Sequence, residues 1–182
     1  YIGTTDATFV SVDVGLGAMD VLGWRFSDLA VKATAQGGQW RAVLSGKELD
    51  GDVTWQPEGS GKLVARMKTF AIPAAAPGAS QAASREPQSQ AAPGDLPALD
   101  VVTEQLIIKN RLLGRLEFVA VPISRDWRLD WLLLTNPEST LTLDGVWQLA
   151  LPRSTTRINL RLETSDIGKL LTRLGQPEGV KR

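Results

Sequence analysis

One pattern of strand residues occurs twice along this chain, and this repeat limits the possible folds more than any other feature. Stretches of the first half match stretches of the second half, first at an offset of 87 positions and later at offsets of 92 to 95. The matched stretches are Val12-Asp13-Val14 with Leu99-Asp100-Val101, Asp28-Leu29-Ala30-Val31 with Arg115-Leu116-Glu117-Phe118, Trp40-Arg41 with Trp127-Arg128, Leu49-Asp50-Gly51 with Leu143-Asp144-Gly145, Trp55 with Trp147, and Leu63, Ala65 and Met67 with Ile158, Leu160 and Leu162. Because the offset changes mainly near turns, we predict one sheet unit that is repeated with hairpin loops of altered length.

Alternation of apolar and polar residues with a period of two predicts that nearly all of the chain is β-strand. Strands are expected at residues 9–16, 28–35, 39–45, 49–55 and 62–70, and then at 99–103, 105–109, 114–121, 127–134, 140–149 and 155–163. Turn residues such as Gly37-Gly38 and Asn136-Pro137 separate neighbouring strands, at spacings suited to hairpins. The predicted fold is therefore mainly β. We expect a curved antiparallel sheet that is built from two repeated meander units and has the shape of an open groove or a taco.

The predicted units are divided by a stretch that has almost no large apolar residue. Residues 74–97 are rich in Ala, Pro, Ser, Gln and Gly, a composition that cannot bury enough surface to offset its ordering entropy. We expect a flexible linker or long loop there, with the first unit at residues 1–73 and the second at 98–182.

One short helix is predicted at the end of the second unit, at about residues 166–174. Ser165 can cap it and Asp166 falls in its first turn, near the positive end of the helix dipole. Four apolar residues spaced for one helical face follow, and Gly175 with Pro177 gives a stop signal. The apolar residues are Ile167, Leu170, Leu171 and Leu174. Such an amphipathic helix should pack on the sheet.

Alternate residues of a strand share a face, and in both units one of the two faces is apolar. The main candidates for this apolar face are Leu29, Val31, Trp40, Leu44, Val53, Leu63, Met67, Leu116, Phe118, Leu129, Trp131, Leu133, Leu143, Ile158, Leu160 and Leu162. The opposite face carries Asp, Arg, Lys and Glu. A sheet of this kind must cover its apolar face, either by curling into a sandwich or closed barrel or by holding an apolar ligand in an open gutter. The matched tryptophans are expected to be core anchors in the first case and to line a lipid or glycan groove in the second.

Composition excludes several kinds of chemistry. The chain has no cysteine and no histidine, which removes disulfides, thiolate metal sites and every catalytic arrangement that needs either residue. Its formal net charge is zero, whereas a nucleic-acid binder normally has a basic excess. The chain has no apolar run of about 18 residues, so the sequence predicts no membrane-spanning helix. Asp50 and Asp52 could supply a carboxylate pair for glycoside hydrolysis, but they lie among other charges of the polar face. We therefore expect no catalytic residues, no metal site and no cofactor.

Several stretches of the chain resemble one known family. They are residues 99–101, 111–117, 126–130, 134–141, 145–147, 156–163 and 165–175, and in the first unit residues 49–55 and 70–73. Together they are similar to the C-terminal region of the YhdP family, which comprises large AsmA-like proteins of Gram-negative envelopes. The likeness covers nearly the whole chain and lies in strand patterns.

The resemblance implies a segment of a bridge-like lipid-transfer protein that is not an enzyme. Its apolar face would shield phospholipid acyl chains in a β-groove on their way between the inner and outer membranes, so the apolar candidates above would face lipid. The partners would be phospholipid and the remainder of the same larger protein. The location would be the periplasm, with a tether to the inner membrane through a segment outside this chain, which begins with Tyr1 and is expected to be a piece of a longer protein.

Two other functions fit the residues alone. The chain could be a structural or protein-interaction β-domain of the envelope, with the apolar face packed shut and partners bound at an edge strand. A carbohydrate enzyme would require a deep cleft with two carboxylates about 5 to 10 Å apart.

Overall fold

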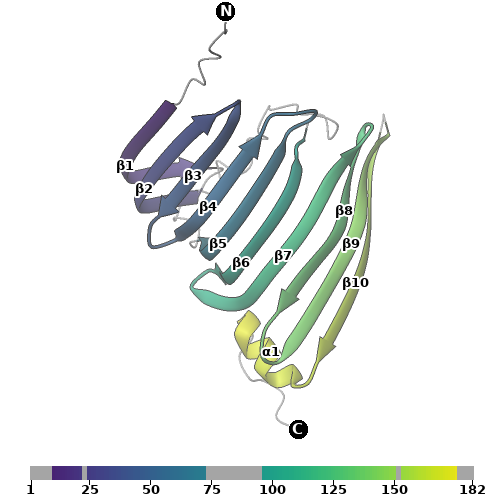
Figure 1. Ribbon diagram of the computed structural model, residues 1–182. Coiled ribbons are helices and arrows are strands. Elements are labelled where there is room, and N and C mark those ends of the chain that lie inside the picture. The colour runs from purple at the N-terminus through teal and green to yellow at the C-terminus, as the bar shows by residue number, and fades with distance from the viewer. Residues whose placement is uncertain (1–9, 22–23, 73–95, 151–152, 176–182) are drawn as a thin grey trace, which may run out of the picture.

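The computed structural model describes residues 10–21, 24–72, 96–150 and 153–175, which form a single sheet with one helix at its end (Figure 1). The ten strands lie in the sheet in chain order. They are β1 (Val10–Val21), β2 (Trp24–Gln36), β3 (Gln39–Ser45), β4 (Leu49–Gln56), β5 (Lys62–Ile72), β6 (Ala98–Ile108), β7 (Arg111–Ile123), β8 (Asp126–Thr135), β9 (Ser139–Ala150) and β10 (Arg153–Thr164), and α1 (Ile167–Leu174) follows. The predicted fold class, mainly β with an open sheet and a short C-terminal helix, is confirmed.

The predicted strands agree with the structure except at β1, which continues to Val21, at β2, which begins at Trp24, and at β6. Two strands were expected, at residues 99–103 and 105–109, but Ala98–Ile108 is one strand. Its pairing with β7 is irregular between Thr103 and Leu106. The β-bulge there interrupts the alternation of apolar and polar residues and imitates a strand boundary in the sequence.

The two units meet through a parallel pair of strands, the exception in a sheet that is mostly antiparallel as expected. β5 and β6 run in the same direction, with Lys62 beside Ala98 and Ile72 beside Ile108. The other neighbouring strands pair antiparallel. The reason is the odd number of strands per unit. A meander of five strands ends in the direction in which it began, so a second unit in the same orientation starts parallel to the last strand of the first.

This parallel junction explains why a long segment separates the units. From the end of β5 the chain has to return to the start of β6, along a strand of 11 residues or about 35 Å. A tight hairpin cannot make this connection, whereas residues 73–97 are long enough. The predicted linker at 74–97 lies outside the described residues, apart from its last two.

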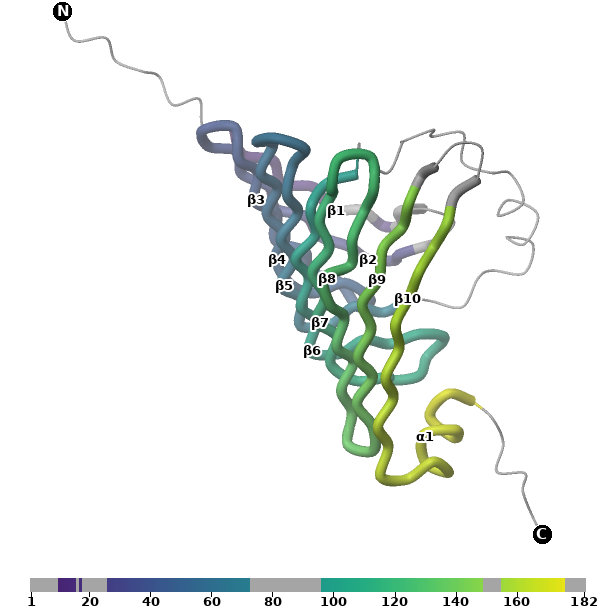
Figure 2. Tube along the Cα trace, turned by 90° about the vertical axis from the view of Figure 1, so that its right-hand side faces the viewer, coloured from purple at the N-terminus to yellow at the C-terminus, as the bar shows by residue number. Residues whose placement is uncertain are grey.

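β-Bulges lie side by side in the middle of the sheet and bend it. The β4–β5 register shifts between Asp50 and Gly51, and the β6–β7 register shifts after Thr103. A bulge bends its strand and increases the local twist, and Figure 2 shows that the sheet curves instead of lying flat. Gly51 has a φ of +148°, and a Cβ atom there would lie 2.4 Å from the carbonyl oxygen of Arg66. Glycine is therefore required at this point of the bend.

The core occupies one face of the sheet, mainly in the first unit. A cluster of buried residues is joined by half-buried neighbours from β2 to β6. The buried members are Phe26, Leu29, Leu49, Ala65 and Met67, and the neighbours are Val31, Leu44, Val53, Phe70 and Val101. In a single-layer sheet, side chains bury one another on the inside of the curve. The alternative of a sandwich or closed barrel is wrong, because the sheet stays open between β1 and β10.

Replacing Gly51 with alanine should destabilise the protein by about 2 kcal/mol or more, because the methyl group meets backbone atoms and the φ value is unfavourable for other residues. Gly15→Ala in β1 is the matched control, since nothing lies within 4 Å of a Cβ atom there. Urea unfolding followed by circular dichroism measures both variants. Equal midpoints for the two would contradict this account of the bend.

Candidate functional site on the apolar face

Strand register carries one apolar face across the whole sheet. Residues paired on neighbouring strands point to the same side, so a row of pairs can be followed from strand to strand. One such row contains Val31, Leu44, Gly51, Met67, Thr103, Leu116, Leu134, Leu141 and Leu162, and the next contains Ala33, Ala42, Val53, Ala65, Val101, Phe118, Leu132, Leu143 and Leu160. A third contains Trp40, Trp55, Leu63, Leu99, Ala120, Leu129, Gly145 and Ile158. Thirteen of the sixteen predicted apolar-face residues lie in these rows, and Leu29 belongs to the buried cluster on the same face, which leaves two exceptions.

The two exceptions are Trp131 and Leu133, which lie on the polar face. Leu129 pairs with Ala120 of β7, but Trp131 pairs with Val119, the next residue back along that strand, so these two positions of β8 face opposite ways. Leu133 correspondingly pairs with Glu117. A bulge between Leu129 and Leu132 causes this change, and the predicted face of both residues is wrong.

Leu132 and Leu134 take the places that were expected for Trp131 and Leu133. They pair with Leu143 and Leu141 of β9. Sequence reasoning missed them because residues 131–134 are all apolar, so that either register puts a large apolar side chain on the inner face.

The apolar face is shielded in the middle of the sheet and uncovered at its edges. Ala65 and Met67 on β5 are each 7% exposed. On β10, however, Ile158 is 56% exposed and Leu160 is 63% exposed. Leaving such side chains in water costs free energy in proportion to their apolar area. The structure thus has a continuous apolar surface that is open to a ligand at one end.

Tryptophans lie on this surface in cross-strand pairs. Trp40 pairs with Trp55, and Trp127 pairs with Trp147, so the sequence repeat brings equivalent pairs into equivalent places. Trp40 and Trp147 are 42% and 38% exposed, which is more than expected of core anchors. The second pair borders a hollow of about 200 Å³ whose lining is almost entirely apolar. It is lined by Trp127, Leu129, Leu143, Gly145, Val146, Trp147, Thr156 and Ile158.

Ion pairs within strands and between neighbouring strands occupy the polar face. Arg66 contacts Asp100 at 2.8 Å and Arg115 contacts Glu117 at 2.7 Å. Asp52, a member of the carboxylate pair noted in the sequence, lies 3.7 Å from Arg41. Within the described residues, no three His, Cys, Asp or Glu side chains gather as a metal site would require. In the same part of the chain, no helix has the length and apolarity to cross a membrane.

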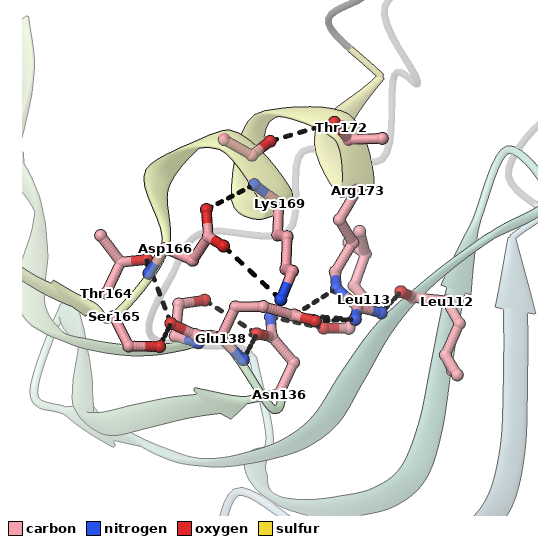
Figure 3. Close-up of polar contacts among 12 residues, drawn as sticks. Leu112, Leu113, Asn136, Glu138, Thr164, Ser165, Asp166, Lys169, Thr172 and Arg173 are labelled. Carbon is pink, nitrogen blue, oxygen red and sulfur yellow. Dashed lines mark hydrogen bonds and ion pairs between the residues drawn. The ribbon is translucent and has the colours of Figure 1, made fainter. Parts of the chain in front are cut away.

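α1 is held at one end of the sheet by polar contacts, which Figure 3 shows. Asp166, and not Ser165 as expected, is its N-cap, and its side chain accepts a bond from the backbone of Lys169. Arg173 bonds both carboxylate oxygens of Glu138 and donates to the carbonyl of Leu112 at 2.8 Å. These contacts, which we call the helix clasp, join α1 to the β8–β9 turn and the start of β7.

The apolar stripe of α1 packs less fully than expected. Leu170 is 5% exposed, whereas Ile167 and Leu174 are more than half exposed. A hollow of about 420 Å³ lies beside the helix clasp, bordered by charged side chains of α1 and β7. The helix therefore covers only the end of the sheet and leaves the apolar face of β10 open.

The fold and the site together define a class: an open, one-sided sheet of repeated five-strand units whose apolar face is partly uncovered. The family model described as YhdP protein matches residues 5–182, almost the entire sequence. The chain belongs to the YhdP family, as the resemblance of its strand patterns indicated. A search of curated proteins and a search of solved structures gave no match.

Acid should loosen the helix clasp. The hydrogen bond from Arg173 lowers the pKa of Glu138 below its ordinary value of 4.5, and the bond from the Lys169 backbone lowers the pKa of Asp166 below 3.8. Because both pKa values are depressed in the folded state, the stabilisation is complete above the ordinary values and is lost as pH falls through the folded ones. NMR signals of residues 167–174 should therefore move toward random-coil positions below about pH 4.5, before the sheet signals change.

Glu138→Gln should bring part of this change to neutral pH, with Asp166 responsible for the remaining acid dependence. Glu117→Gln is the control, because Glu117 pairs with Arg115 on the polar face, away from α1. If Glu138→Gln and Glu117→Gln gave the same α1 signals at pH 7, the clasp would not hold the helix.

Proposed function

We propose that this chain is a segment of an envelope protein that shields phospholipid acyl chains on its apolar face during transport between the inner and outer membranes. The observation that carries this proposal is the continuous apolar face that the sheet leaves open, with its most exposed side chains on β10. Ile158, Leu160 and Leu162 are 56%, 63% and 47% exposed. A surface of this kind requires an apolar ligand or a further apolar surface to cover it.

The energetics of acyl chains suit this surface. Each methylene group kept from water contributes about 0.8 kcal/mol, so a chain of 16 carbons faces a barrier on the order of 12 kcal/mol if it is fully exposed. The curve of the sheet is lined by leucine, valine and tryptophan, which offer contact area without directional polar bonds. A lipid could slide along such a surface, because no hydrogen bond has to break at each step.

Repetition also suits a conduit. The second unit continues the apolar rows of the first through β5 and β6 without a break in register from Lys62 to Met67. Additional units of the same kind would lengthen the surface in the same way. We propose that the remainder of the same larger protein does this.

Membership of the YhdP family supports the setting of this function. We propose that the segment works in the periplasm of a Gram-negative bacterium and is tethered to the inner membrane through a segment outside this chain. In this proposal the segment binds phospholipid and catalyses no reaction. The alternative, a structural domain whose apolar face is packed shut, is less well supported, because Leu160 and its neighbours on β10 are exposed.

Charge on the apolar face should abolish lipid binding without unfolding the sheet. Leu160→Asp is suitable because Leu160 lies on an edge strand and is already 63% exposed. Native mass spectrometry of the chain, purified from a Gram-negative host, should show copurified phospholipid in defined stoichiometry, and this species should be lost in Leu160→Asp. Thermal unfolding checks that the variant is folded.

Trp131→Asp is the matched control, because it puts the same charge on the polar face of the same unit. This variant should keep its lipid. Loss of lipid from both variants would mean that binding does not depend on the face, and a parent protein that carries no lipid after incubation with phospholipid vesicles would contradict the proposal.

A further inference from the structure

The apolar rows of the second unit end at a hollow whose lining is charged. Leu141 pairs with Leu162 on the apolar face, and the pair of Ser139 with Thr164 continues that face by one row. The Thr164 hydroxyl donates to the carbonyl oxygen of Glu138 at 3.0 Å, and Glu138 lines the hollow of about 420 Å³ beside the helix clasp. The charged hollow therefore lies next to the end of the apolar face.

Positive charge predominates around this hollow. Arg111, Lys169 and Arg173 line it. The carboxylates beside them are Glu138, which also lines the hollow, and Asp166, which lies 3.6 Å from the Lys169 ammonium. Three cations thus stand beside two carboxylates, and a concave site with this balance attracts an anion.

Two of the three cations are able to take a further ligand. Arg173 is not one of them, because it is bonded to both carboxylate oxygens of Glu138. Lys169 has a side chain that is 71% exposed, and Figure 3 shows it reaching from α1 toward Glu138. Arg111 donates to the carbonyl oxygen of Thr172 at 3.1 Å, a bond that uses one of the five N–H donors of its guanidinium. Arginine and lysine donors of this kind suit phosphate oxygens.

A second hollow lies about one acyl chain away from the first. Leu162, Leu160 and Ile158 follow one another on the apolar face of β10, and Ile158 borders the apolar hollow beside Trp127 and Trp147. From Leu162 to Ile158 the strand rises about 13 Å. A bilayer core of about 30 Å contains two leaflets, so one acyl chain spans about 15 Å. An acyl chain that starts beside the charged hollow can therefore end in the tryptophan hollow.

We propose that the hollow beside the helix clasp binds the phosphodiester group of the phospholipid whose acyl chains lie on the apolar face, with Arg111 and Lys169 as its contacts. The inference rests on the proposed function, because it places the headgroup of the same lipid. The excess of positive charge favours a headgroup of net negative charge, such as phosphatidylglycerol, over a zwitterionic one, such as phosphatidylethanolamine.

Such a site gives the lipid an orientation and a stopping point. The apolar rows offer no directional bonds, so they do not fix where a lipid stands along the strands. A charged contact at α1 holds the headgroup at one end, and the acyl chains then lie along β10 toward the tryptophan hollow. The helix clasp thereby connects the position of α1 with the position of the lipid.

Competition between two lipids tests the preference. The chain is incubated with vesicles that contain equal amounts of phosphatidylglycerol and phosphatidylethanolamine, and native mass spectrometry measures the ratio of the two bound lipids. We expect a ratio of at least about three for the parent and about one for Arg111→Gln combined with Lys169→Gln. The control combines Lys32→Gln with Arg157→Gln, which removes the same two types of charge from the polar face, and it should keep the ratio of the parent.

A single substitution separates headgroup binding from damage to the helix clasp. Lys169→Gln leaves Arg111 and the bonds between Arg173 and Glu138 unchanged, and it should lower the lipid ratio to about two. NMR signals of residues 167–174 at pH 7 show whether α1 stays in place in each variant.

Inorganic phosphate distinguishes a lipid headgroup from a soluble anion. Without lipid, phosphate should move the NMR signals of Arg111 and Lys169 with half-saturation above about 10 mM, because acyl chains supply most of the binding free energy. Saturation below about 1 mM would assign the hollow to a soluble phosphate compound and overturn the headgroup proposal.

Two results of the competition would overturn this inference and leave the proposed function intact. One is a parent chain that binds the two lipids equally. The other is a ratio that stays at the parent's value when Arg111 and Lys169 are both replaced. A parent chain that binds neither lipid would contradict the proposed function itself, and this inference with it.

Discussion

The parallel pairing of β5 with β6 is the constraint on which the rest of the structure depends. It joins two units into one sheet, and its register, with Leu63 beside Leu99 and Ala65 beside Val101, makes their apolar faces continuous. A shift of one residue at this junction would turn the apolar face of the second unit to the opposite side. The ion pair between Arg66 and Asp100 lies on the other face and favours the same register, because a shifted strand would separate the two charges.

Much of this arrangement could be predicted from the sequence, because alternation and repetition are both local signals. The strands, the face of nearly every apolar residue and the terminal helix followed from them. The parallel junction did not, although counting five strands in the first unit would have required it. The extra strand predicted within β6 hid the equality of the two units, since a bulge after Thr103 resembles a turn in the sequence.

Bulges also account for the error in the candidate site. One extra residue in β8 reverses the face of every position that follows, and nothing in residues 131–134 marks where it occurs. Tertiary contacts also determine how much of the helix is buried. The stripe of α1 is regular, but its burial depends on where the clasp of Arg173 and Glu138 places the helix, and there Leu170 alone among the four stripe residues is buried.

The first unit contains most of the buried core, and the second unit contains the most exposed apolar side chains. The first unit bends at Gly51 and buries Leu29, Ala65 and Met67, so it supplies most of the core. The second repeats the same strands but ends in β10, where nothing in the described chain covers Ile158 and Leu160. An exposed apolar patch of this kind marks a surface that binds something apolar, whereas the buried cluster of the first unit is already covered by its own neighbours.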